Sequence, residues 1–286
     1  MKEIKLCAFA DESSQSLQGQ IAALTKNSIP YLEVRGINGK NVSAFTEQEA
    51  KEYNKQLKDN GIKVWSIGSP LGKVDIGVDF NQYKDTVKRV LQTANIFECD
   101  KIRMFSFFHA YNERNKVMDY LSQMVQLGNE FGVKMYHENE KDIYGDVAER
   151  VQDIMNTVSG LEFIYDPANY LQCGENADKT LKMFHSKTGY FHIKDVIAST
   201  GELVPAGFGD GKISTLVDML DGSKVLTLEP HLAVFEGYSS IDNSEMKNKF
   251  CYSSNVEAFD AAVNALKQII IGCGYVVAAN GLRFTK

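Results

Sequence analysis

Short apolar runs alternate along the chain with longer segments whose apolar residues recur every three or four positions, which is the spacing of one helix face. The runs lie at residues 4–10, 30–36, 63–69, 101–107, 133–138, 162–167, 189–195 and 224–230. The helical segments lie at 14–27, 45–59, 79–97, 112–131, 144–159, 176–186, 213–221 and 255–271. Repeated strand–helix pairs favour a parallel sheet, and eight pairs in this length favour its closure. We predict an α/β fold, a single (β/α)8 barrel that forms one domain over residues 1–286.

The residues around the segment 45–59 support the helix predicted there. Thr46 has an N-cap side chain, and Glu49 follows three positions later, which is the spacing of a capping box. Gly61 stands where the chain leaves the segment, and glycine adopts the left-handed conformation that ends many helices. We therefore expect a helix between these residues.

Two long connections are expected at the carboxyl-terminal face of the barrel, where barrels of this kind build their active sites. They span about 195–212 and about 230–254, and loops of this length are usually functional or disordered. The tail after residue 271 either closes the barrel or packs on a partner.

Composition and charge narrow the classes of function. Apolar residues make up 44% of the 286 residues, the formal net charge is −6, and the 31 basic residues are dispersed. Because nucleic-acid binding needs clustered Lys and Arg, we expect no nucleic-acid partner. The chain lacks a run of about 18 uncharged apolar residues, so we expect no membrane partner. The first residues lack a signal-peptide pattern, which predicts a cytoplasmic protein, and a homo-oligomer is left open.

Metal-capable side chains end the last four predicted strands. They are Glu138, Asp166, His192 and Glu229, separated by 28, 26 and 37 residues, each close to the length of one strand–helix unit. Strand side chains alternate between the barrel interior and the helices. The apolar neighbours of His192 and Glu229 suit the helix side, which leaves the imidazole and the carboxylate pointing inward. We expect all four side chains to meet at one mouth of the barrel.

Three carboxylates and one imidazole form an oxygen-rich ligand set. Such a set suits one divalent cation, namely Mn²⁺, Mg²⁺, Co²⁺ or Zn²⁺. A buried carboxylate without a partner is costly, so acidic residues at the ends of buried strands require such a counter-charge. The carboxylates exceed the charge of a dication, which favours a neutral diol or keto-alcohol as the ligand. The predicted partner is a small-molecule sugar or polyol.

Other residues are candidates for contact with that substrate. Lys194 shares the inward parity of His192, and it either donates to an oxyanion or leaving hydroxyl or pairs with Asp195, Glu229 or a phosphate. Glu33 and Arg35 share an inward parity, and they either pair with each other as a plug or contact substrate.

Two rings close to the predicted mouth have two interpretations each. Trp65 either offers its ring to the apolar face of a sugar or packs in the core. His231 either orients Glu229 or lies in the loop that follows the last strand.

Five motifs carry a resemblance to a known family. They are HENE (137–140), YDPANY (165–170), FHIKD (191–195), GFGDGKI (207–213) and LEPH (228–231). In this order they resemble the motif series of the sugar phosphate isomerase/epimerase family, which has a xylose isomerase-like TIM barrel. ADES (10–13) and LEVRG (32–36) extend the likeness over nearly the whole chain. The resemblance implies one divalent metal held by Glu138, Asp166, His192 and Glu229.

The family contains several activities. It includes ketose 3-epimerases, hydroxypyruvate and xylose-type isomerases, inosose and dehydroshikimate dehydratases, and endonuclease IV. The resemblance implies that Glu138 and Glu229 move a proton next to a carbonyl, and Lys194 is a third candidate catalytic residue. We therefore expect a divalent-metal-dependent isomerase or epimerase that acts on a keto-sugar or sugar phosphate through an enediolate.

Three other functions are weighed against this one. Sugar epimerases of the family carry a His three residues after the Asp on strand six, whereas this chain has Asn169, a candidate substrate contact. That departure favours an inosose-type dehydratase, which eliminates a hydroxyl after the same proton abstraction. An endonuclease IV-like enzyme needs a multi-zinc cluster with more histidines and a basic groove, and the five histidines and the negative net charge of this chain count against it. A non-catalytic sugar-binding barrel would keep the pocket without metal-dependent turnover.

Overall fold

Eight parallel strands close into a barrel in the computed structural model, which describes residues 2–232, 234 and 250–286. The strands are β1 (Glu3–Ala8), β2 (Tyr31–Val34), β5 (Lys63–Ile67), β6 (Lys101–Met104), β7 (Lys134–Glu138), β8 (Glu162–Tyr165), β9 (Tyr190–Ile193) and β12 (Ser223–Leu228). Each pairs with the next in this order. β12 also pairs with β1, from Ser223 opposite Glu3 to Leu228 opposite Ala8. The predicted (β/α)8 barrel is confirmed.

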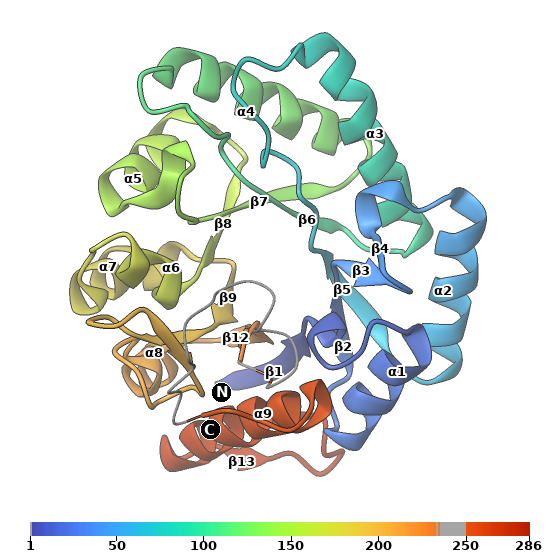
Figure 1. Ribbon diagram of the computed structural model, residues 1–286, viewed down its shortest axis with the longest axis vertical. Helices are drawn as coiled ribbons and strands as arrows, with labels where there is room; N and C mark the ends of the chain where they lie inside the picture. Colours follow the sequence, from blue (N-terminus) through green and yellow to red (C-terminus); the bar gives the residue numbers. More distant parts are fainter. Residues whose placement is uncertain (1, 233, 235–249) are drawn as a thin grey trace.

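A ring of helices surrounds the strands, as Figure 1 shows. They are α1 (Leu17–Lys26), α2 (Glu47–Asp59), α3 (Phe80–Ile96), α4 (Arg114–Glu130), α5 (Ala148–Thr157), α6 (Pro167–Gln172), α7 (Ala177–Phe184), α8 (Ile213–Met219) and α9 (Asn255–Gly272). The sequence pattern did not predict the short α6. The capping box of α2 is confirmed, because Thr46 accepts from the Glu49 N–H and Glu49 accepts from the Thr46 N–H. Among these helices none is long and apolar enough to cross a bilayer.

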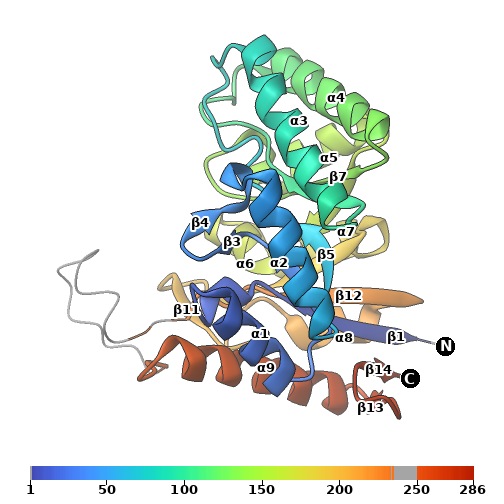
Figure 2. The same cartoon turned by 90° about the vertical axis from the view of Figure 1, so that its right-hand side faces the viewer.

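Within the described residues, two small hairpins extend the carboxyl-terminal face, on the side opposite the chain termini in Figure 2. They are β3 (Gly36–Ile37) with β4 (Lys40–Asn41), and β10 (Asp195–Ile197) with β11 (Glu202–Val204). Part of the expected loop 195–212 is thus a hairpin. Of the expected loop 230–254, residues 233 and 235–249 lie outside the described residues. Single 3₁₀ turns occupy Ala10–Glu12, Val42–Ala44, Tyr144–Asp146 and His185–Lys187.

The tail packs on the barrel. β13 (Val276–Val277) and β14 (Arg283–Thr285) form a hairpin, and β14 pairs antiparallel with Glu3–Lys5 of β1. β2 pairs with β1 only at Cys7 and Ala8, so the tail covers the edge that β2 leaves open. Of the two alternatives for the tail, the structure shows the closing one.

The alternation of strand side chains separates two apolar cores. One lies between the strands and the helices and contains Phe191, Ile193, Leu226 and Leu228. The other fills the lower barrel interior and contains Cys7, Tyr136, Ile164, Tyr190 and Val225. Because side chains on one face recur every second residue, the position above Tyr190 in the interior belongs to His192. The interior therefore changes from apolar to ionisable toward its carboxyl-terminal end.

A glycine in the connection after β5 allows two backbone segments to approach closely. Gly72 has φ +83°, and a Cβ added there would lie 2.1 Å from the carbonyl oxygen of Phe105. We expect Gly72→Ala to reduce the free energy of unfolding by about 3 kcal/mol, because backbone strain and a clash add together. Urea unfolding measures the loss.

Gly132 provides the matched control for this substitution. Its φ is +69°, but apart from the glycine and its chain neighbours no atom of the described residues lies within 4 Å of an added Cβ. Gly132→Ala should therefore cost only the backbone strain, about 1 kcal/mol. Equal losses in the free energy of unfolding of the two variants would show that the close approach to Phe105 does not require glycine at position 72.

Candidate metal centre and active site

Four metal-capable side chains meet at the carboxyl-terminal ends of neighbouring strands. Glu138 ends β7, Asp166 follows β8, His192 lies in β9, and Glu229 follows β12. All four are buried, and the most accessible, Glu229, is 4% exposed. One potential ligand atom of each lies within 4.8 Å of those of the other three. The barrel thus brings together the four residues that end the last four predicted strands.

Local structure leaves one oxygen of Asp166 directed to this centre. The other, Oδ1, accepts a hydrogen bond of 3.0 Å from the Asn169 N–H and caps the first turn of α6. Pro167 occupies the first position of this helix, where a missing N–H costs nothing. The strand end and the helix start therefore determine the orientation of the Asp166 carboxylate together.

Two oxygens of the cluster lack a hydrogen-bond donor. Asp166 Oδ2 and Glu229 Oε2 are buried and accept no hydrogen bond from any residue that the structure describes. Their nearby charges are Lys194 Nζ, 3.1 Å from Asp166 Oδ2, and His192 Nδ1, 3.1 Å from Glu229 Oε2. Carboxylate oxygens and an imidazole suit Mn²⁺, Mg²⁺ or Zn²⁺, so these residues fit a divalent cation.

The surroundings shift the pKa values of Asp166 and Glu229 in opposite directions. Burial raises the pKa of Asp166 to about 6, against the lowering effect of Lys194. Burial also raises the pKa of Glu229, but Lys194 and the imidazoles of His192 and His231 lower it well below its ordinary value. Glu229 therefore stays ionised more readily than Asp166.

Glu33 lies beneath His192 and is fully buried. Its Oε2 is 3.2 Å from His192 Nε2, while its Oε1 accepts a hydrogen bond of 2.9 Å from the Tyr190 hydroxyl. The other imidazole nitrogen, Nδ1, is 2.8 Å from Glu138 Oε1. Carboxylates commonly orient ligating histidines in this way. Glu33 thus pairs with His192 and not with Arg35, and its contact with substrate stays a prediction.

Arg103, in β6, belongs to the same cluster and was not among the sequence-based candidates. Its NH1 donates to Glu138 Oε2 at 3.2 Å and lies 3.6 Å from Glu229 Oε1. The sequence contained a signal for this position, because the basic residue Arg103 interrupts an apolar run between Ile102 and Met104. A charged residue at an inward position of a buried strand requires a counter-charge.

Arg35 and His231 approach Glu229 from the rim. Arg35 NH1 donates to Glu229 Oε1 at 3.0 Å, and Arg35 Nε donates to Asp11 at 2.8 Å. His231 Nε2 lies 3.3 Å from Glu229 Oε1, and the backbone N–H of His231 donates to Glu12 Oε2 at 2.8 Å. Of the two interpretations of His231, the structure places its ring against Glu229. Neither Glu12 nor Asp11 is among the candidate residues predicted from the sequence.

Lys194 and Asn169 contact the predicted ligands directly. Lys194 is buried and pairs with Asp166, which was not among its expected partners. Asp195 instead accepts backbone N–H groups of the glycine-rich loop, including Gly207 at 2.8 Å. The Asn169 amide donates to the Asn139 carbonyl at 2.8 Å and lies 3.5 Å from Glu138 Oε1. Asn169 therefore supports the ligand residues from behind.

Trp65 packs against the apolar cluster that fills the lower barrel interior. Its ring packs edge-on against Tyr190, with centroids 6.1 Å apart, and Tyr190 in turn contacts His192. The pairing of β2 with the Trp65 strand, β5, shifts its register between Leu32 and Glu33. The shift places Ser66, the residue after Trp65, opposite Glu33. Trp65 therefore packs on the apolar cluster of the barrel interior, and its contact with a sugar stays a prediction.

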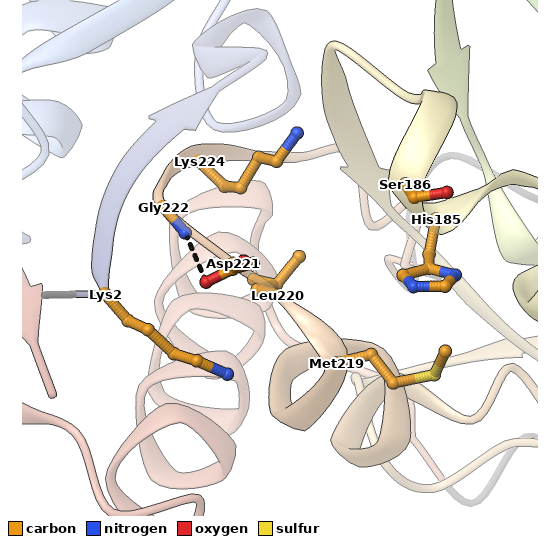
Figure 3. A pocket seen from close by; sticks show the side chains of 8 residues that line it. All are labelled: Lys2, His185, Ser186, Met219, Leu220, Asp221, Gly222 and Lys224. Atoms are coloured by element: carbon orange, nitrogen blue, oxygen red, sulfur yellow. Dashed lines mark hydrogen bonds between the residues drawn. The ribbon is translucent and has the colours of Figure 1, made fainter.

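A separate cavity of about 660 Å³ lies at the amino-terminal side of the barrel (Figure 3). Its lining is Lys2, His185, Ser186, Met219, Leu220, Asp221, Gly222 and Lys224. The ammonium groups of both lysines donate to backbone carbonyls, Lys224 to Thr188 and Lys2 to Asp218. Barrel enzymes perform chemistry at the other face. The candidate site is therefore the ligand cluster.

The fold and the site define a class of protein. The family model described as xylose isomerase-like TIM barrel matches residues 29–240. This chain therefore belongs to that family, as its motifs predicted. No curated protein sequence matches the chain.

Several solved structures have the same fold. The probable 3-DHS dehydratase AsbF from Bacillus anthracis is 16% identical with a TM-score of 0.66, over 93% of this chain and 98% of that one. The IolI protein with a bound zinc atom is 17% identical with a TM-score of 0.69, over 94% and 98%. D-psicose 3-epimerase with D-tagatose, from Clostridium cellulolyticum H10, is 13% identical with a TM-score of 0.66, over 93% and 99%. At these identities the likeness shows the fold alone.

Proposed function

We propose that this protein is a divalent-metal-dependent isomerase or epimerase of a keto-sugar or sugar phosphate. The observation that carries the proposal is the buried cluster of Glu138, Asp166, His192 and Glu229, with two oxygens that no described donor satisfies. Family membership and the epimerase and dehydratase among the similar structures support it as analogy.

Glu138 and Glu229 are the proposed proton-transfer residues. Glu138 ends β7 and Glu229 follows β12, and β8 and β9 lie between these two strands, so the two carboxylates approach the centre from different sides. An epimerase needs this arrangement, because one carboxylate removes a proton from carbon and the other returns it to the opposite face. When bound, the metal supplies Lewis acidity that makes the proton next to a carbonyl more acidic.

The neighbouring cations complete the proposed chemistry. Lys194, as a buried ammonium beside Asp166, donates a hydrogen bond to an oxygen that gains charge in the enediolate. Arg35 is partly exposed at the rim and, beyond its pair with Glu229, is the proposed contact for a phosphate or hydroxyl group of the substrate. His231 orients Glu229 from the same side.

A dehydratase of an inosose-type substrate is the second candidate. Lys194 favours it, because a buried ammonium next to the cluster can give a proton to a leaving hydroxyl. Asn169 also favours it, because this amide stands where sugar epimerases of the family carry a His. A barrel that binds sugar without turnover is a third candidate, and it predicts no metal-dependent exchange.

The test is a screen of keto-sugars, sugar phosphates and inososes with Mn²⁺ in D₂O. Deuterium incorporation next to the carbonyl, detected by NMR, is expected for at least one substrate and only with metal. An epimerised product supports the first candidate, and a new ultraviolet-absorbing enone supports the dehydratase. Binding of a sugar without any deuterium incorporation would contradict both enzymatic candidates.

A further inference from the structure

The guanidinium of Arg103 stands between the two proposed proton-transfer residues. It is enclosed by the rings of Phe9 and Phe105, whose centroids lie 4.9 Å and 5.0 Å from its central carbon. NH2 donates to the Gly68 carbonyl at 3.2 Å, which leaves NH1 facing Glu138 and Glu229. Arg103 is 5% exposed, so its guanidinium is held inside the barrel and not at the rim.

Each glutamate directs its two oxygens to different partners. In Glu138, Oε2 accepts from Arg103 at 3.2 Å, whereas Oε1 is 2.8 Å from His192 Nδ1. In Glu229, Oε1 lies 3.6 Å from Arg103, whereas Oε2 is 3.1 Å from His192 Nδ1. Both carboxylates therefore turn one oxygen toward Arg103 and the other toward the imidazole.

We propose that Arg103 is a positioning residue that makes Glu138 and Glu229 bind a cation through one oxygen each. The inference rests on the proposed function, because it assumes that the cluster holds a dication. Arg103 retains Glu138 Oε2 through a hydrogen bond of 3.2 Å and lies 3.6 Å from Glu229 Oε1, to which Arg35 NH1 donates at 3.0 Å. With Arg35 holding Glu229 Oε1 from the rim, Arg103 prevents the carboxylates from chelating a cation with both oxygens. The retained oxygens keep a fixed position from which a carboxylate can reach a substrate proton.

This arrangement selects among cations. Ca²⁺ takes six to eight oxygen ligands and readily accepts both oxygens of a carboxylate, whereas Mg²⁺ requires a smaller, nearly octahedral set. One oxygen from each glutamate therefore disfavours Ca²⁺. If the oxygens that face Arg103 were released, both oxygens of a glutamate could bind one cation, which should favour Ca²⁺ specifically. Loss of a positive charge alone should instead strengthen the binding of every dication.

The test compares Ca²⁺ and Mg²⁺ binding by isothermal titration calorimetry. Arg103→Met removes both the charge and the hydrogen bonds, and Arg103→Lys keeps the charge without the fork that reaches both glutamates. Both variants should shift the Ca²⁺/Mg²⁺ preference toward Ca²⁺ by about tenfold. With Mn²⁺ bound, deuterium incorporation should fall about 100-fold, because the retained oxygens lose their position.

Two comparison variants separate position from charge. Arg35→Met removes an equal charge that holds Glu229 Oε1 but leaves Glu138 Oε2 bound to Arg103, so it should strengthen the binding of both cations and shift the Ca²⁺/Mg²⁺ preference much less than the Arg103 variants do. Arg89→Met makes the same substitution on the exposed face of α3, where Arg89 contacts Thr86, and should leave both affinities unchanged. A wild-type preference in both Arg103 variants, or an equal shift in Arg35→Met, would overturn the positioning role while leaving the proposed function intact. Failure of the wild-type protein to bind any dication would overturn both.

Discussion

Replacement of Glu138 by Gln should abolish metal-dependent deuterium incorporation. The substitution preserves the shape of the side chain but removes the negative charge that abstracts or returns a proton. It also weakens a ligand and the pair with Arg103. Loss of general base catalysis alone costs about 10²–10⁴-fold in rate, and weaker metal binding adds to it. NMR of the substrate in D₂O measures the rate for each variant at saturating Mn²⁺.

Glu162→Gln is the matched control for this substitution. Glu162 begins β8 at the opposite end of the barrel, so the same change of charge is made far from the cluster. This variant should keep the wild-type rate and a similar melting temperature. Wild-type activity in Glu138→Gln would exclude Glu138 from the proton transfer and leave Glu229 as the only one of the two proposed bases.

Removal of divalent metal should lower the melting temperature as well as the activity. A ligand that binds only the folded state, at about 100 times its Kd, stabilises the fold by about 2.7 kcal/mol. For a chain of this size that corresponds to a rise of about 5 °C in Tm. Differential scanning calorimetry of chelator-treated protein, before and after addition of Mn²⁺, measures the rise.

Asp166→Asn provides a sharp test of this stabilisation. The amide oxygen can still cap α6 by accepting from the Asn169 N–H, so the helix start is retained. The charge that faces Lys194 and the predicted cation is lost. This variant should show little rise in Tm with Mn²⁺, whereas Asp178→Asn, at an exposed position of α7, should show the full rise. An equal rise in both variants would place the bound cation elsewhere.

The barrel could be predicted from the sequence because its signals are local. An apolar run followed by a helical period recurs eight times, and Thr46 with Glu49 identifies a helix start within four residues. The short α6 was missed because it begins directly at Asp166-Pro167, without an apolar stripe of its own. Periodicity has little power over six residues.

The candidate site was predictable in part. Parity and spacing placed Glu138, Asp166, His192 and Glu229 on one mouth, because equivalent strand ends meet at one face of a barrel. Parity could not tell how deep in the barrel a side chain lies. Trp65 and Glu33 are therefore both inward residues, but they lie beneath the cluster and not at its rim.

The sequence by itself determined the order of strands and helices, the metal-capable residues and the family. Only the tertiary structure decided the partners, because they join segments far apart in the chain. Glu33 meets His192 across 159 positions, and Arg103 meets Glu138 across 35. These contacts depend on the register with which the strands close, including the shift between β2 and β5. Register results from packing around the whole barrel, and no local stretch of sequence encodes it.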